Sequence, residues 1–463
     1  MPNSIAQAGE LLRQRKISPV ELTQQSLKKI SELNPALNAF ITVTADEALA
    51  QARMAESEIH RGKWRGPLHG IPVGLKDIID TAGTRTTAAS CLFKDRIPGQ
   101  DAEVVQRLKD SGAIFLGKQN LHEFAYGGSS MISCFGEVRN PWNVAHIAGG
   151  SSGGSAASVA AGLGLAAIGT DTAGSVREPA AQCGVVGLKP TYGRVSSRGV
   201  IPLSISLDHV GPLTRTVEDA ALLLQAIAGF DRGDPTSVDL PVGNYSQVRS
   251  GEKPRLRIGI PREFFCEDLD REVASAFEEA VSVLRTIAPE IRDMNLAVPT
   301  DRTLQLAESY AVHAEHVAQS PELFQPETLR RIRAGEGISR EVAEEKRREL
   351  KTLRDEIGTI FEKTELLVTP AVPIPAPQIA DLKEHPEQLR PRELILLRNT
   401  RPFNVWGLPA ISVPCGFTNS GLPIGLQIAG PHWGEAKVLQ LAYAYEQATA
   451  WHTREPKPPA TSQ

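Results

Sequence analysis

Short apolar runs and amphipathic segments alternate along most of the chain. Apolar runs typical of buried strands lie at residues 71–75, 113–116, 163–168, 256–260 and 411–413. Segments with the apolar spacing of a helix lie at residues 102–109, 217–227, 271–287, 340–361 and 436–447. This alternation predicts an α/β fold in a single large domain, with a central mixed, largely parallel twisted β-sheet covered by helices on both faces.

The N-terminal part of the chain differs from the rest because its signals are mostly helical. Residues 18–21 supply an N-cap, a first-turn proline and the glutamate of a capping box, and residues 44–47 repeat the box. We therefore expect residues 1–62 to form a helical N-terminal layer and residues 63–463 to form the main structural unit.

Composition narrows the classes of function. The 463 residues are 41% hydrophobic and 22% charged, which suffices for a large packed core. A net charge of −4 with both signs interspersed provides no basic stripe for a phosphate backbone, so we expect no nucleic-acid partner. The N-terminal sequence predicts neither a signal peptide nor a membrane span. We therefore expect a cytoplasmic protein with no membrane partner.

The cysteines and histidines fit no metal or cofactor site. The five cysteines are far apart and form no C-x-x-C pair, which argues against a disulfide framework or a zinc site and favours reduced thiols. His122-Glu123 lacks the second histidine of a zinc-binding H-E-x-x-H motif, and no phosphate-binding glycine motif occurs. We expect no metal and no other cofactor. The cysteines are Cys91, Cys134, Cys183, Cys266 and Cys415.

The most unusual segment places serines among glycines. Residues 149–155 read Gly-Gly-Ser-Ser-Gly-Gly-Ser, and residues 169–177 contain Ser175 directly after three small or hydroxyl-bearing residues. Glycine costs conformational entropy, so its clustering around serines needs a reason. Free backbone N–H groups that face an oxyanion provide one, because small side chains leave them unobstructed. A flexible linker is the other interpretation, but linkers lack the strand and helix signals that flank this segment.

A nucleophilic serine needs a base, and the residues alone leave two candidates open. His209, beside Asp208, could complete a Ser-His-Asp triad, although a lone histidine is more often structural. Lys76 follows the apolar run at 71–75, where burial would lower its pKa and leave an amine that can accept a proton. An ion pair between Lys76 and Asp77 is an equally good interpretation of this position.

Together these segments resemble the amidase signature family. The resemblance implies the family's fold and its Ser-cisSer-Lys triad, in which the corresponding residues here are Lys76, Ser151 and Ser175. In that mechanism neutral Lys76 takes the proton of Ser151, and Ser151 takes the proton of Ser175 as Ser175 attacks a carbonyl carbon. The matching segments are Lys76-Asp77 and residues 149–154, 169–177, 187–194, 400–404 and 407–410.

The resemblance also implies supporting roles around the triad. The backbone N–H groups expected to hold the oxyanion are those of Thr172, Ala173, Gly174 and Ser175. The residues expected to support the cis peptide, the relay and the loop are Gly150, Ser152, Asp171 and Arg177. The chain departs from the family pattern at Ala173, where glycine is common, and at Glu178, which places a charge where a neutral residue is common.

The reaction implied by the resemblance is hydrolysis of a carboxylic amide through an acyl-enzyme on Ser175. We expect a free-standing amidase for small or aryl amides, and esters and carbamates as further substrates because they pass through similar tetrahedral intermediates. The partner would be this small-molecule substrate, and the chain would be a monomer or homodimer. The residues expected to line the substrate pocket are Ala125, Tyr126, Gly127, Phe403 and Trp406.

Two other functions remain open. One is the glutaminase subunit of a tRNA-dependent amidotransferase, whose signature region is similar and includes residues 120–127. Those subunits hold the amino group of glutamine with an aspartate at a position that Leu397 occupies here, which would leave an ammonium unpaired. The chain is therefore expected to be closer to general amidases. The other alternative is a non-catalytic scaffold, which the complete triad argues against.

Overall fold

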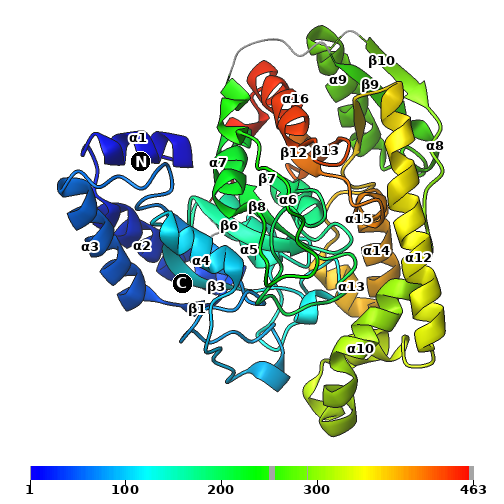
Figure 1. Cartoon of the computed structure of the whole chain (residues 1–463), viewed down its shortest axis with the longest axis horizontal. Coiled ribbons are helices and arrows are strands. Elements are labelled where there is room, and N and C mark those ends of the chain that lie inside the picture. The colour runs from blue at the N-terminus through cyan, green and yellow to red at the C-terminus, as the bar shows by residue number, and fades with distance from the viewer. Residues whose placement is uncertain (1, 250–255, 289, 458–463) are drawn as a thin grey trace.

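The computed structural model describes residues 2–249, 256–288 and 290–457, and in these ranges eleven strands form one sheet (Figure 1). The strands in spatial order are β1 (Phe40–Val43), β3 (Ile114–Gln119), β2 (Pro72–Lys76), β6 (Ala166–Asp171), β8 (His209–Thr214), β7 (Val186–Lys189), β12 (Ala410–Phe417), β13 (Pro423–Ala429), β11 (Leu366–Pro370), β9 (Arg257–Pro261) and β10 (Glu290–Met294).

The sheet is mixed, which confirms the predicted α/β class. Strand β2 pairs in parallel with β3 and β6, and β9 pairs in parallel with β10 and β11. The remaining neighbours, which include all pairs from β6 through β13 to β11, are antiparallel. Parallel pairs thus lie toward the two ends of the sheet, and its antiparallel centre is a detail that the alternation of strands and helices did not predict.

Helices pack along the sheet, and two long helices, α10 and α12, lie along one side of the molecule (Figure 1). The bounds of the helices that follow the N-terminal part are α4 (Glu103–Asp110), α5 (Gly153–Ala160), α6 (Arg177–Cys183), α7 (Val217–Ile227), α8 (Arg262–Phe265), α9 (Arg271–Ile287), α10 (Thr303–Gln319), α11 (Pro326–Arg333), α12 (Arg340–Glu356), α13 (Ile379–Glu384), α14 (Leu389–Leu396), α15 (Arg401–Val405) and α16 (Glu435–Ala448). No helix in the described ranges has the length and apolar character to cross a membrane.

The N-terminal part is helical, with α1 (Ile5–Arg13), α2 (Pro19–Leu37) and α3 (Ala45–His60). The capping box predicted at Ser18 and Glu21 is present at the start of α2. The second box is not, because the Thr44 hydroxyl donates to the Phe115 carbonyl at 3.1 Å instead of capping α3. Strand β1 lies between α2 and α3 and pairs with β3, so this part of the chain also supplies an edge strand of the main sheet.

The expectation of reduced thiols throughout is wrong at one pair. Cys91 and Cys134 form a disulfide, with a Cα–Cα distance of 5.5 Å. The two residues are 43 positions apart, Cys91 at the start of a short 3-10 helix (Cys91–Phe93) and Cys134 in a turn, so their spacing in the sequence does not indicate the contact. Cys183, Cys266 and Cys415 are free thiols.

Candidate active site

Lys76 lies at the end of β2, between β3 and β6, and its side chain is fully buried. Its Nζ donates to the hydroxyl oxygens of Ser151 and Thr170, each at 2.7 Å. Burial lowers the pKa of Lys76 to about 7, although the carboxylates of Asp171 and Asp208 oppose the shift. A large fraction of Lys76 is therefore neutral near pH 7 and can accept a proton.

The alternative ion pair of Lys76 with the neighbouring carboxylate is not formed. Asp77 Oδ1 lies 4.0 Å from the Nζ of a different lysine, Lys118, and Asp77 Oδ2 accepts the Thr87 N–H at 2.9 Å. Successive side chains of a strand point to opposite sides, which separates Lys76 from Asp77. The buried amine of Lys76 is therefore free to bind the hydroxyl groups of Ser151 and Thr170.

Ser151 lies in the turn that precedes α5, and the Gly150–Ser151 peptide bond is cis. The Ser151 carbonyl accepts the His122 N–H at 3.1 Å and the Ser130 hydroxyl at 3.3 Å. A Cβ atom at Gly150 would lie 2.8 Å from the Ser130 nitrogen, so the close approach of these segments requires glycine there. The turn is therefore fixed by its contacts with His122 and Ser130.

Ser175 lies between β6 and α6, next to the Ser151 turn. Its carbonyl accepts the Ser152 N–H at 3.2 Å, which sets the two serine-bearing segments side by side. Ser152 Oγ donates to the Thr170 carbonyl at 3.1 Å and accepts the Thr170 N–H at 3.3 Å. The fold thus brings Lys76, Ser151 and Ser175 together from three separate parts of the sequence, with Thr170 and Ser152 as the contacts between them.

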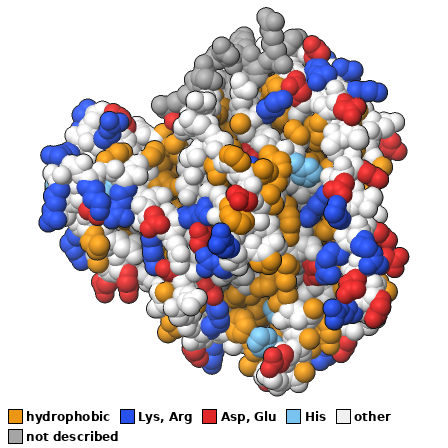
Figure 2. Space-filling view, in the orientation of Figure 1, with side chains coloured by type: hydrophobic (Ala, Val, Ile, Leu, Met, Phe, Trp, Pro, Cys, Tyr) orange, Lys and Arg blue, Asp and Glu red, His pale blue; other side chains and the backbone are white. Residues whose placement is uncertain are grey.

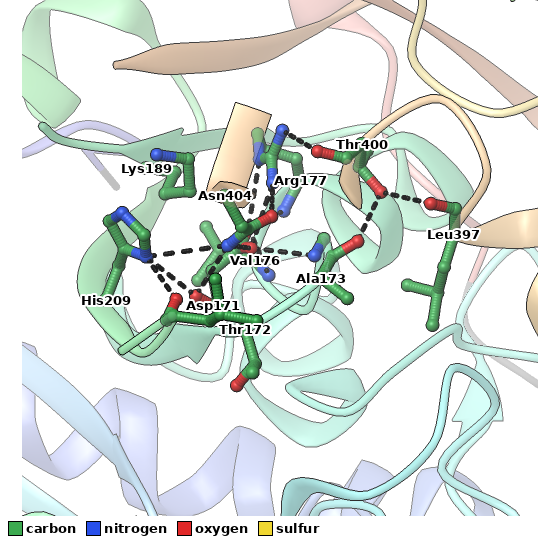
Figure 3. A network of polar contacts seen from close by, with 12 residues as sticks. Asp171, Thr172, Ala173, Val176, Arg177, Lys189, His209, Leu397, Thr400 and Asn404 are labelled. Carbon is green, nitrogen blue, oxygen red and sulfur yellow. Dashed lines mark hydrogen bonds and ion pairs between the residues drawn. The ribbon is translucent and has the colours of Figure 1, made fainter. Parts of the chain in front are cut away.

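The loop that carries Ser175 is braced by a buried ion pair (Figure 3). Arg177 Nη2 lies 3.0 Å from Asp171 Oδ1, and both side chains are fully buried. Arg177 also donates to the Thr400 carbonyl at 2.9 Å and to Asn404 Oδ1 at 2.7 Å. Burial alone would raise the pKa of Asp171, but the Arg177 guanidinium holds it well below its usual range. The loop is thereby tied to β6 and to α15.

The N–H groups expected to hold an oxyanion are not all available. Gly174 N–H already donates to Asp171 Oδ1 at 2.7 Å, which corrects the expectation for this residue. The N–H groups of Thr172, Ala173 and Ser175 donate to no acceptor within the described ranges. Three donors therefore remain free at the loop, and the fourth is used to hold the carboxylate that braces it.

Gly174 also has a conformational role in the loop. Its φ is +134°, and a Cβ atom there would overlap the Thr400 side chain. The Thr400 hydroxyl donates to the Ala173 carbonyl at 2.8 Å, which holds the peptide between Ala173 and Gly174 in place (Figure 3). The loop is thus packed against the segment that follows α14, and only glycine fits at position 174.

The Ser-His-Asp alternative is excluded by geometry. The ring Nδ1 of His209 lies 2.6 Å from the Leu207 carbonyl, and the Asp208 carboxylate accepts the Thr172 hydroxyl at 2.6 Å rather than the imidazole. Burial lowers the pKa of His209 well below its usual value. His209 is therefore a neutral structural residue that has no serine as a partner in the described part of the chain, and Lys76 is the base that the geometry offers.

A cavity of about 290 Å³ adjoins this site. Its wall includes Ala125, Thr170, Thr172 and Asp208, so it meets the loop of free N–H groups at Thr172, while Lys76, Ser151 and Ser175 do not line it. Burial raises the pKa of Asp208 to about 6, against the hydrogen bond from Thr172. Sequence reasoning identifies Asp208 only as a partner of histidine, and it misses Thr170 although this residue lies inside one of the motifs.

The other residues expected in the pocket are placed differently. Tyr126 is buried, and its carbonyl accepts Arg331 Nη1 at 2.6 Å. Gly127 packs so closely on the His122 ring that no side chain would fit. Phe403 and Trp406 lie in an apolar cluster of the core with partners such as Phe265 and Leu408, and they do not line the cavity.

Comparison with known proteins gives a family match over most of the chain. The amidase family model matches residues 21–439. A glutamyl-tRNA(Gln) amidotransferase subunit from Geotalea daltonii is 43% identical over 97% of this chain and 98% of the relative.

Solved structures are similar over nearly the whole length. A chain from a vestigial protein complex that reveals the evolutionary origins of an s-triazine catabolic enzyme has a TM-score of 0.88 and 31% identity, covering 96% of this chain and 98% of that one. The corresponding glutamyl-tRNA(Gln) amidotransferase subunit from Thermotoga maritima has a TM-score of 0.79 and 34% identity, covering 96% and 95%.

These relatives correct the expectation that the chain is closer to general amidases. They also contradict the free-standing amidase for small or aryl amides as the leading function, because the full-length relatives at 40–43% identity carry the name of an amidotransferase subunit. Ester and carbamate substrates find no support in them. Leu397 alone does not support the expectation of a general amidase, because one position in a variable segment is weaker evidence than similarity over the whole chain.

The expectation of a small-molecule partner alone, with no nucleic acid and at most a homodimer, is contradicted by the same relatives. They are named as one subunit of an enzyme that acts on a tRNA. A net charge of −4 argues against a phosphate-binding stripe on this chain, but a complex can bind RNA through another subunit. Because the family model covers most of its length and a full-length relative is 43% identical, this chain belongs to the amidase family, hydrolases of carbon–nitrogen bonds in linear amides.

Proposed function

We propose that this chain is the amide-hydrolysing subunit of a tRNA-dependent amidotransferase and that it releases ammonia from the side-chain amide of glutamine. The observation that carries the amide chemistry is the buried amine of Lys76, whose Nζ lies 2.7 Å from Ser151 Oγ. Full-length similarity to a glutamyl-tRNA(Gln) amidotransferase subunit supports the choice of reaction.

The proposed reaction begins with neutral Lys76. Lys76 takes the proton of Ser151, Ser151 Oγ takes the proton of Ser175, and Ser175 Oγ bonds to the amide carbon. The carbonyl oxygen becomes an oxyanion, which the free N–H groups of Thr172, Ala173 and Ser175 stabilise. As the carbon–nitrogen bond breaks, the proton returns through Ser151 to the leaving nitrogen, which departs as ammonia. Water then adds to the acyl-enzyme with the same base, glutamate leaves, and Ser175 regains its proton.

The cavity beside the loop supplies the proposed place for glutamine. Asp208 lines this cavity, and we assign the α-amino group of glutamine to its carboxylate. A carboxylate here would replace the one that is missing at Leu397, and the ammonium would not be left unpaired. Ala125 lines the same cavity.

Apolar surface near the cavity supports assembly with other subunits. The exposed fractions of four large apolar residues in one stretch of the chain are 53% for Ile205, 41% for Phe230, 37% for Val238 and 39% for Leu240. Figure 2 shows apolar side chains gathered over the middle of one face, between areas in which both charges are mixed. Extended apolar surface of this kind is typical of protein contacts. We assign this apolar surface to contact with a partner protein of the complex. We also propose that the assembled enzyme acts in the cytoplasm, where tRNA is aminoacylated.

The test is to measure release of ammonia and glutamate from glutamine, both with the purified chain and with the chain isolated together with its native partners. Wild-type protein should hydrolyse glutamine, and more so in the complex. Ser175→Ala should abolish the reaction and labelling by a fluorophosphonate. Ser155→Ala is the matched control, because Ser155 is a buried serine of the same motif whose hydroxyl has no partner among the described residues. Turnover of other amides with none of glutamine, alone or in complex, would contradict the proposal.

A further inference from the structure

The Glu178 side chain closes the turn that precedes Ser151. Gly150 N–H donates to Glu178 Oε2 at 2.7 Å. A Cβ atom at Gly149 would lie 2.7 and 2.9 Å from the two carboxyl oxygens, so the carboxyl group packs directly on the turn. Gly149 has a φ of +78°, a conformation that suits glycine. Glu178 therefore contacts both residues that lead into Ser151.

Glu178 also belongs to the helix that begins at the nucleophile. It is the second residue of α6, and its N–H donates to the Gly174 carbonyl at 2.7 Å. The neighbouring Arg177 points to Asp171 and to α15, so it braces the Ser175 loop from the other side. Glu178 is thus the residue of α6 whose side chain reaches from the nucleophile segment to the Ser151 turn.

Burial favours the neutral form of the Glu178 carboxyl group. The side chain is fully buried, no cation of the described ranges lies within ion-pair distance, and Oε1 has no hydrogen-bond partner there. Burial raises the pKa of Glu178 well above its usual value, and the carboxylates of Glu393 and Asp171 raise it further, against the bond from Gly150. Burial therefore disfavours the charge that the sequence leads one to expect at this position.

We propose that Glu178 is a positioning residue that acts through Ser151. Its carboxyl group holds Gly150 N–H so that Ser151 Oγ stays within hydrogen-bond distance of Lys76 Nζ. It contacts neither the amide nor the attacking oxygen, so its loss should lower kcat and leave KM almost unchanged. The inference rests on the proposed serine–lysine chemistry and not on glutamine as the substrate.

Three variants test this role. Glu178→Ala removes the acceptor and should lower kcat by about 10²-fold, the usual cost of a displacement of about 1 Å at a reacting group. Glu178→Gln keeps an oxygen acceptor of the same size and charge and should restore most of the activity. Gln182→Ala is the matched control, because Gln182 is a fully buried polar residue one turn later in α6 and contacts the Ile374 carbonyl rather than the turn. It should keep wild-type kcat.

A double-mutant cycle decides whether Glu178 acts through Ser151. The loss caused by Glu178→Ala should become much smaller when it is measured in a Ser151→Ala background, with the rate of fluorophosphonate labelling of Ser175 as the readout. An equal loss in both backgrounds, a glutamine variant as slow as the alanine variant, or a loss no larger than that of Gln182→Ala would overturn the inference. If wild-type protein hydrolyses no amide and Ser175 is not labelled, the proposed function itself fails, which is a different outcome.

Discussion

Lys76 Nζ lies 2.7 Å from Ser151 Oγ, and neither side chain is exposed to solvent. An ammonium group in this position would have only hydroxyl and carbonyl oxygens as direct partners, since its nearest carboxylates act at longer range. A neutral amine is therefore favoured by burial, and it can share a proton with the serine. The protonation state of Lys76 therefore determines whether the reaction can begin.

Replacing Lys76 by alanine should remove the base. We expect kcat for glutamine hydrolysis to fall by about 10²- to 10⁴-fold, the usual contribution of a positioned base. Thermal unfolding should show that the variant is folded, because no ion pair is lost with the amine. Retention of most of the activity by folded Lys76→Ala would remove lysine from the base role.

The pH dependence should follow the same group. Lys76 has a pKa of about 7 in the folded protein and is active without its proton, so kcat/KM should rise with pH and level off above that value. The measurement is kcat/KM for glutamine from pH 5 to 9, with the stability of the protein checked at each pH. A rate that falls as the pH rises through 7 would contradict the assignment.

A larger side chain at Gly174 should disrupt the loop of N–H donors. Gly174→Ala places a Cβ atom on the Thr400 side chain at a φ of +134°, and we expect kcat to fall by about 10²- to 10³-fold, as when one oxyanion donor is lost. Ala173→Gly is the control, because it removes a methyl group from the same loop without a clash. Comparable turnover in the two variants would show that the loop geometry is unimportant.

The secondary-structure elements are predictable from sequence because their signals are local. The helices expected at 217–227 and 271–287 have the expected bounds, and the strand expected at 71–75 is found at Pro72–Lys76. Because one face of a helix or strand is buried at regular intervals, the bounds of such elements can be predicted to within a few residues. The Gly-Ser segments mark close backbone contacts, but the roles of Lys76, Ser151 and Ser175 follow from the family resemblance and stay predictions.

The remaining features depend on contacts between distant parts of the chain. The disulfide joins Cys91 to Cys134, and the cavity places Asp208 beside Thr172, which no spacing in the sequence indicates. The free N–H at Gly174 was wrongly expected because the fold turns the Asp171 side chain back onto its own loop. A charge is expected at Glu178 from the sequence, and only the burial of this residue in the fold raises its pKa.

Asp208 should matter for glutamine and not for the chemistry itself. Asp208→Asn removes the carboxylate that we assign to the α-amino group, so KM for glutamine should rise by about tenfold or more, with a smaller change in kcat. A primary amide without an amino group, such as butyramide, serves as the control substrate, and its KM should stay the same. An equal rise of KM for both substrates would show that the variant only distorts the cavity.

Two buried carboxyl groups near the start of α7 should make stability depend on pH. Burial raises the pKa of Asp219 to about 7 and that of Glu446 to about 8. Unfolded values are near 4, so the folded protein binds more protons than the unfolded chain between about pH 4 and pH 8. Stability should therefore fall as the pH rises through this window. Asp219 accepts the Ala6 N–H and Glu446 accepts the Val217 N–H, and a neutral amide oxygen can also accept these bonds.

Asp219→Asn and Glu446→Gln test this assignment by removing the buried charge without removing the acceptor. Thermal unfolding followed by circular dichroism should show a Tm above wild type at pH 8 by a few degrees and a much smaller difference at pH 5, because only the wild type must bury an ionised carboxylate at the higher pH. The double variant should show the weakest dependence of Tm on pH. A Tm lowered equally at both pH values would mean that the carboxylates are ionised and stabilising, which is the opposite sign.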